Sequence, residues 1–115
     1  MIDIREYIDR QGNSSYAAWF NSLNAQAAAK VTTALTRLAL GNFSNVKGVG
    51  SGVFEYKIDF GPGYRVYFGK DGERLVILLG GGAKKRQQHD IHTALTNWQD
   101  YKQRKLKEKS NAPHS

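Results

Sequence analysis

Three glycines and three cations follow one another in the stretch LLGGGAKKRQQHDI, which runs from Leu78 to Ile91. Lysine and arginine can neutralise phosphate oxygens, and glycines allow a backbone to approach a ligand without a side-chain clash. The spacing matches neither G-x-G-x-x-G nor the P-loop, so a nucleotide site of either kind is not predicted. Two interpretations remain open: a plain turn from a strand into a helix, and one border of a phosphate site formed by Lys84, Lys85 and Arg86.

A second group of polar side chains lies on two predicted strands, residues 53–60 and 64–69. Successive side chains of a strand point to opposite faces of a sheet, so the alternation separates an apolar face from a polar one. The apolar face carries Phe54, Tyr56, Ile58, Phe60, Tyr64, Val66 and Phe68, and the opposite face carries Glu55, Lys57, Arg65 and Tyr67. We expect the apolar face to pack beneath a pair of helices and the head group of Arg65 to lie outside the core.

The polar face has a composition that suits a nucleic-acid backbone. Its cations can hold phosphate, and Tyr67 can stack on a base or donate a hydrogen bond. The cations that follow the glycine run are expected at its edge. Simpler interpretations stay open, because Glu55 and Lys57 can be solvated partners on an exposed sheet and Arg65 can have a structural role.

His89, Asp90 and His92 raise the question of a metal site. Two histidines three positions apart can share a helix face, but they form an incomplete ligand set and no acidic third ligand is indicated. No metal and no other cofactor are therefore predicted. Asp90 lies near a predicted helix start, where the helix dipole favours a carboxylate, and we expect it to cap that helix.

Composition limits the class of protein. The chain has 115 residues, which indicates one domain, and a formal net charge of +7, which favours an anionic partner. It contains no cysteine, as is compatible with a reducing cytosol. The first residues carry charges throughout and predict no signal peptide, and no apolar run approaches the roughly 20 residues of a membrane helix. A cytoplasmic protein without a membrane segment is expected.

The first half of the chain predicts a short strand and two helices. Residues 2–6 read as a weak strand. Ser14 is a suitable N-cap for a helix over residues 15–23, and Asn24 for a second helix over residues 25–40. The connection between the helices is so short that an antiparallel hairpin is expected.

The second half predicts a meander and a final helix. The segment GNFSNVKGVGSG reads as a loop, and strands are expected over residues 53–60, 64–69 and 74–79. A third helix is expected over residues 87–102, and the basic residues 103–115 read as a disordered, solvated tail. The predicted order is β-α-α-β-β-β-α, an α+β fold with a helical hairpin packed on a small antiparallel sheet.

An ordered set of motifs resembles a known family. The segments LALGNFSNVKGVGSGVFEYKIDFGPGYRVYF and LLGGGAKKRQQHDI are similar to the addiction-module killer proteins of the RelE/ParE superfamily, and more narrowly to its phage-derived, HigB-like branch. The resemblance covers residues 2–102, and it implies a RelE-like toxin domain over residues 1–102. It implies the toxin of a type II toxin–antitoxin pair, with a small helix-turn-helix antitoxin that covers the toxin and carries any contact with operator DNA.

The resemblance also implies an activity. RelE-like and HigB-like members cut mRNA on the ribosome without a metal ion: the 2′-hydroxyl attacks the adjacent phosphate while basic residues stabilise the added negative charge. The implied catalytic residues are Arg65, Lys84, Lys57 and Tyr67. The implied RNA-binding or phosphate-binding residues are Lys47, Lys85, Arg86 and His89, with His92 as a weaker candidate. Lys57 or Lys47 would also accept a proton if it were desolvated.

Two other functions stay open. ParE-like members of the same superfamily act on DNA gyrase instead of mRNA. A nucleic-acid-binding module without toxicity would show the same charge and the same fold, because a fold does not determine a function.

Overall fold

A mixed five-stranded sheet forms the centre of the computed structural model, which describes residues 1–110. The strand order is β1-β5-β4-β3-β2, in which β1 pairs with β5 in parallel and the other neighbours are antiparallel. The strands are β1 (Asp3–Glu6), β2 (Val46–Gly50), β3 (Val53–Ile58), β4 (Tyr64–Lys70) and β5 (Leu75–Ala83). The helices are α1 (Ser15–Asn21), α2 (Ala25–Ala39) and α3 (Gln87–Ser110). This architecture confirms the predicted α+β class.

The two N-terminal helices begin where the sequence predicts. The Ser14 Oγ accepts a hydrogen bond from the Ala17 N–H at 3.0 Å, and the Asn24 Oδ1 accepts one from the Ala27 N–H at 2.9 Å. Each side chain satisfies a backbone donor that has no partner inside its helix. Both predicted caps are therefore confirmed.

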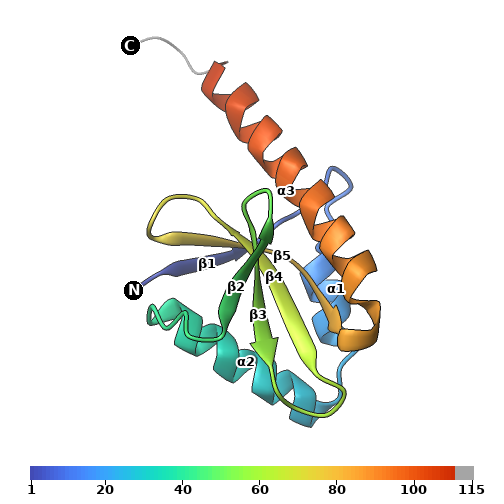
Figure 1. Ribbon diagram of the computed structural model, residues 1–115. Coiled ribbons are helices and arrows are strands. Elements are labelled where there is room, and N and C mark those ends of the chain that lie inside the picture. Colours follow the sequence, from blue (N-terminus) through green and yellow to red (C-terminus); the bar gives the residue numbers. More distant parts are fainter. Residues whose placement is uncertain (111–115) are drawn as a thin grey trace.

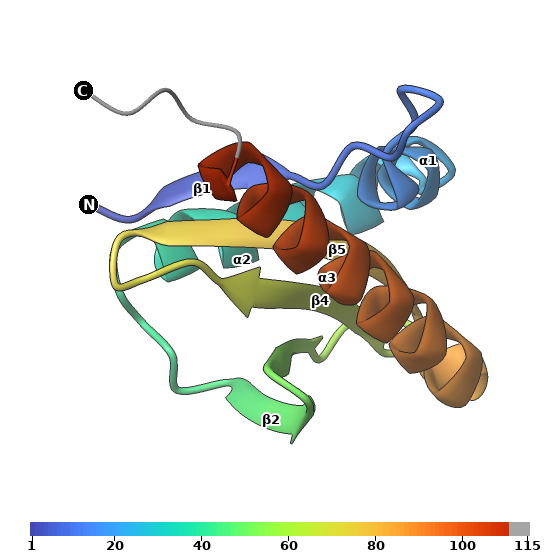
Figure 2. The same cartoon turned by 90° about the horizontal axis from the view of Figure 1, so that it is seen from above.

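The sheet separates two apolar cores. The core beneath α1 and α2 is formed by Tyr16, Val31, Ala34, Leu38, Tyr56, Ile58, Val66, Phe68, Val76 and Leu78. The core beneath α3 is formed by Tyr7, Val53, Tyr67, Ile77, Leu79, Ala94 and Trp98. Figure 2 shows α3 crossing β4 and β5 on the side opposite α2. The predicted packing of the aromatic face beneath the helical pair is confirmed, but the opposite face is largely covered by α3.

Two strand predictions need correction. Residues 46–50, predicted as loop, form the edge strand β2, so the order of elements is β-α-α-β-β-β-β-α. The glycine run, predicted as the exit from a strand, lies inside β5, which continues to Ala83. A Cβ atom on Gly81 would overlap the ring of Trp19, and one on Gly82 would overlap the carboxylate of Asp90. The glycines therefore serve close packing on both faces of the sheet.

The last helix is longer than predicted. It continues past Lys102 to Ser110, and Figure 1 shows its C-terminal part projecting beyond the sheet. The expectation of a disordered segment is therefore wrong for residues 103–110, and residues 111–115 lie outside the described part. Contacts with the body explain the order, because Arg104 Nη2 donates to the Ile8 carbonyl at 2.5 Å and Lys105 pairs with Asp71.

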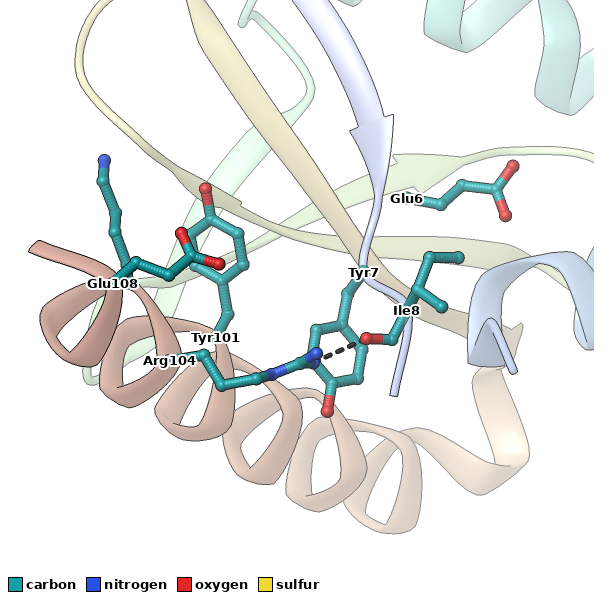
Figure 3. A pocket seen from close by; sticks show the side chains of 7 residues that line it. Glu6, Tyr7, Ile8, Tyr101, Arg104 and Glu108 are labelled. Carbon is teal, nitrogen blue, oxygen red and sulfur yellow. Dashed lines mark hydrogen bonds between the residues drawn. The ribbon is translucent and has the colours of Figure 1, made fainter. Parts of the chain in front are cut away.

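A cavity of about 290 Å³ lies where the chain after β1 meets α3. Figure 3 shows Arg104 reaching past the ring of Tyr7 to the Ile8 carbonyl, and the Tyr7 hydroxyl donates to Asp100 at 2.6 Å. Arg104 Nε also lies 2.9 Å from Asp100 Oδ2, so the polar groups at the cavity contact one another. This cavity therefore belongs to the attachment of α3 to the rest of the fold.

Acid sensitivity should report on the same attachment. Hydrogen bonds from Lys105 and Tyr101 hold the pKa of Asp71 below its ordinary value of 3.8. The contribution of Asp71 to stability is therefore complete above that value and is lost as pH falls through the lower, folded pKa. We expect Tyr101→Phe to lose less unfolding free energy than the wild type between about pH 6 and pH 3, as measured by urea titration. Asp71→Asn should remove this part of the pH dependence, and an unchanged slope in Tyr101→Phe would contradict the assignment.

Candidate functional site

A buried ion pair on the α3 side of the sheet forms the base of the candidate site. Arg65 Nε lies 2.6 Å from Glu55 Oε1, and the two side chains are only 7% and 1% exposed. The strand register places Lys57 beside Arg65, and Gln87, the first residue of α3, donates to Glu55 Oε1 at 2.9 Å. The prediction that Arg65 lies on the face away from α1 and α2 is confirmed. The prediction that its head group is exposed is wrong, because Glu55 and the start of α3 hold it in place.

Two lysines form the rim of this site. Lys47 Nζ on β2 lies 3.4 Å from Glu55 Oε2, and its side chain is 69% exposed. Lys57 on β3 lies 4.0 Å from the exposed carboxylate of Asp59. Together with Arg65 and Glu55 they line a depression of about 290 Å³, which is completed by Ser44, Asn45 and Val46. Because both lysine side chains remain mostly in water, their charges are available to an anion that enters the depression.

Gly63 brings the start of Lys84 close to Arg65. Its carbonyl accepts a hydrogen bond from the Lys84 N–H at 2.9 Å, and its φ of +79° is one that other residues rarely adopt. A Cβ atom on Gly63 would lie 3.7 Å from the Lys84 Cβ and 3.8 Å from Arg65 Nη1. The Cβ of Lys84 and the buried guanidinium of Arg65 therefore both lie near Gly63, although Lys84 does not line the depression.

The remaining predicted cations lie farther along the chain. Lys85 and Arg86 are exposed on the 3-10 turn after β5, and His89 is exposed in the first turn of α3. Within the described chain, none of the three lines the depression. The structure thus brings Lys47, Lys57 and Arg65 together around the depression, with the Cβ of Lys84 nearby. Lys85, Arg86, His89 and His92 remain outside this group.

Tyr67 is not a surface residue. It is fully buried beneath α3, and its hydroxyl has no hydrogen-bond partner among the described residues. Burial raises its pKa, and the negative charges of Glu55 and Asp90 raise it further. The prediction that Tyr67 stacks on a base or contacts RNA is therefore wrong, because a residue without exposed surface can do neither.

Asp90 packs against the sheet. Its carboxylate lies over Gly82, the residue that the β4–β5 register places beside Arg65. Burial raises its pKa, while the charges of Arg86 and His89 lower it. The α3 start is therefore attached to the sheet by Asp90 on Gly82 and by Gln87 on Glu55.

The sequence did not predict that Glu55 and Gln87 hold the centre of the site together. The open alternative in which Glu55 and Lys57 are solvated partners is wrong for Glu55, which is nearly inaccessible and contacts Arg65, Lys47 and Gln87. The available signal was that Glu55 and Arg65 share one face of adjacent strands. The contact with Gln87 depends on how α3 folds back over the sheet, which no local pattern encodes.

Two other features are absent from the described part of the chain. No group of three histidine, cysteine, aspartate or glutamate side chains within residues 1–110 could hold a metal ion. No helix in that part of the chain is long and apolar enough to span a membrane.

The fold and the site define a small α+β protein of the RelE-like type, with a cationic depression on the face away from its helical pair. Residues 18–99 match the family described as phage-derived protein Gp49-like (DUF891), and the chain belongs to this family. This is a toxin-like family related to the RelE/ParE fold. A relative in Haemophilus influenzae (strain Rd), an uncharacterized protein, is 44% identical over 81 residues, which cover 70% of this chain and 82% of the relative. The narrower HigB-like assignment remains a prediction.

Proposed function

We propose that this protein is the toxin of a type II toxin–antitoxin pair and that it cuts mRNA during translation. The observation that carries the proposal is the buried guanidinium of Arg65, which lines the depression and whose Nη1 has no hydrogen-bond partner among the described residues. A buried donor without a partner is costly. A phosphate oxygen in the depression would supply the missing acceptor.

The proposed reaction is attack of an RNA 2′-hydroxyl on the adjacent phosphorus, with breakage of the bond to the 5′-oxygen. Arg65 and Lys84 would hold the phosphate and stabilise the negative charge that accumulates on its oxygens. If RNA in the depression desolvates Lys57 or Lys47, the neutral amine of that residue would accept the proton of the attacking hydroxyl, and the leaving 5′-oxygen would take a proton from water.

The proposed setting follows the same reasoning. The substrate is mRNA held in the ribosome, and the site of action is the cytoplasm. A helix-turn-helix antitoxin would cover the cationic depression, and operator DNA would be contacted only through the antitoxin. The net charge of +7 supports an anionic target, and membership of a toxin-like family supports the antitoxin partner.

The decisive experiment is induced expression followed by mapping of mRNA 5′ ends, with and without an inhibitor of translation. We expect growth arrest and cuts within translated messages, and no cuts when translation is blocked. Lys47→Gln with Lys57→Gln should lower cleavage at least about 100-fold, because charge stabilisation and proton transfer each contribute at least that much. Lys107→Gln with Lys109→Gln, which removes two exposed charges from the far end of α3, is the matched control.

A second candidate is a gyrase-directed toxin on the same fold. It is favoured by the burial of Tyr67, since the described lining of the depression then holds lysines, Arg65 and Glu55 but neither histidine nor tyrosine for proton transfer. Altered DNA supercoiling with intact mRNA after induction would select this candidate. Normal growth after induction of the folded protein would instead support a nucleic-acid-binding module without toxicity.

A further inference from the structure

A second depression lies around the edge of the sheet from the candidate site. It has a volume of about 260 Å³ and is formed between α2 and the end of β3. Its charged residues are Lys30, Arg37, Lys57 and Asp59. Asn45 and Lys57 line this depression and also the one above Arg65. The two depressions therefore meet at this edge.

The strand pairing explains why the edge is open there. The β2–β3 ladder begins at the pair Val46 and Tyr56, and only the Asn45 carbonyl reaches farther, where it accepts the Lys57 N–H at 3.1 Å. Where the two strands pair, β2 covers the edge of β3. Beyond Lys57, the edge of β3 has no neighbouring strand on this side within residues 1–110. Lys57 thus lies between the face of the sheet that α3 covers and the face that α2 covers. Figure 1 shows α2 beside the end of β3.

The cations of α2 are placed along the second depression. Lys30 and Arg37 are both exposed, and seven positions put them on the same side of the helix, about 10 Å apart along its axis. Lys30 Nζ lies 5.4 Å from the centroid of the Phe60 ring, which restrains the ammonium group. Within residues 1–110, neither cation has a carboxylate partner within 4 Å. The exposed Asp59 opposes them weakly because water screens its charge.

We propose that one single-stranded RNA occupies both depressions, with the phosphate to be cut at Arg65 and flanking phosphates at Lys30 and Arg37. This inference rests on the proposed function. A strand that passes from one face of the sheet to the other must bend sharply at Lys57. A duplex is stiff over such a distance, whereas a single strand is flexible. The positive charge along the whole path is complementary to the phosphates of that strand.

The test compares short and long RNA under conditions in which no cutting occurs. Oligouridylates of three and nine nucleotides with 2′-O-methyl groups throughout lack the attacking hydroxyl. Their affinities are measured by fluorescence anisotropy between 50 and 200 mM salt, roughly the range over which phosphate contacts show clearly. We expect Lys30→Gln with Arg37→Gln to weaken binding of the nonamer about 10-fold and to leave the trimer unchanged. The slope of log affinity against log salt should fall by about 1.4, because each lost contact with single-stranded RNA accounts for about 0.7.

Control variants separate the two depressions. Lys57→Gln should weaken both oligonucleotides, and Lys107→Gln with Lys109→Gln should weaken neither. Thermal unfolding verifies that each variant is folded. Unchanged nonamer affinity and slope in the Lys30 and Arg37 variant would overturn this inference and leave the proposed function standing, provided that the wild type binds the trimer through Lys57.

Three other results would also overturn it. Equal affinity for a nine-base-pair duplex would exclude the single strand as the occupant. A loss of growth arrest in the Lys30 and Arg37 variant without any change in RNA affinity would assign the second depression to a partner protein. Failure of the wild type to bind either oligonucleotide would overturn this inference, whereas the RNA-cutting function is decided by the mapping of mRNA 5′ ends in translating cells.

Discussion

Arg65→Ala should destabilise the protein by about 3–5 kcal/mol, the range for breaking a buried ion pair by removal of one partner. The carboxylate of Glu55 is 1% exposed and would lose the guanidinium that lies 2.6 Å away. Lys47 and Gln87 would remain in contact with it, but Lys47 reaches in from solvent and Gln87 carries no charge. Urea titration of the purified variant measures the change, which is a large part of the roughly 5–15 kcal/mol available to a domain.

A double variant distinguishes the ion pair from simple loss of volume. Glu55→Gln combined with Arg65→Met removes both charges and retains most of the packing, so it should recover a substantial part of the stability lost in Arg65→Ala. Lys47→Gln, at a side chain 69% exposed, should change stability by less than about 1 kcal/mol. Wild-type stability in Arg65→Ala would show that Glu55 does not depend on its partner. Loss of toxicity in Arg65→Ala alone would not identify a catalytic group, which is why the exposed Lys57 and Lys47 are the better functional probes.

Gly81→Ala should lower the unfolding free energy by about 3 kcal/mol, at the upper end of the usual effect of overpacking. The added methyl group would overlap the six-membered ring of Trp19, and neither a ring nor a central strand can move aside cheaply. Trp19 belongs to α1 and packs on the core beneath the helical pair. The variant should therefore loosen α1 first, which amide hydrogen exchange of residues 15–21 would detect alongside the change in urea midpoint.

The neighbouring glycine provides a matched control. A Cβ atom on Gly80 would meet its nearest neighbour, the Ser15 Cβ, at 4.0 Å, which is an ordinary contact. Gly80→Ala should therefore be neutral or stabilising by up to about 1 kcal/mol, since alanine restricts the unfolded chain. Adding Trp19→Leu to Gly81→Ala should restore part of the loss. Equal behaviour of Gly80→Ala and Gly81→Ala would contradict the packing argument.

Local signals predicted the parts of the fold that local physics controls. Ser14 and Asn24 cap their helices because an N-cap needs only its own turn. The alternation in β3 and β4 assigned Arg65, Glu55 and Lys57 to one face because side chains on adjacent paired strands keep their sides. β2 was missed because VKGVG is rich in glycine and carries little apolar alternation. The glycines of β5 were misread because a close approach by Trp19 or Asp90 has no signature near those positions.

The candidate site was predicted only as far as its side of the sheet. Which of its cations are free depends on α3, which starts after β5 and folds back over β4. That return buries Tyr67 and places Gln87 on Glu55. Tyr67, which the alternation places on the polar face, is therefore part of the core, and the carboxylate of Glu55 holds the start of α3. The contact between Glu55 and Gln87, for example, joins residues 32 positions apart. Such contacts follow from tertiary packing and not from spacing along one element.

The parallel pairing of β1 has a consequence for how the protein is made. β1 is synthesised before the other elements of the described chain, yet its partner residues in β5 are Leu75 to Leu78. A long loop must close before those contacts form, and such distant pairings slow folding. The N-terminal strand must therefore wait unpaired while most of the polypeptide leaves the ribosome, and Gln87 reaches Glu55 later still. For the activity proposed above, this order would keep the nascent chain inactive until its synthesis is nearly complete.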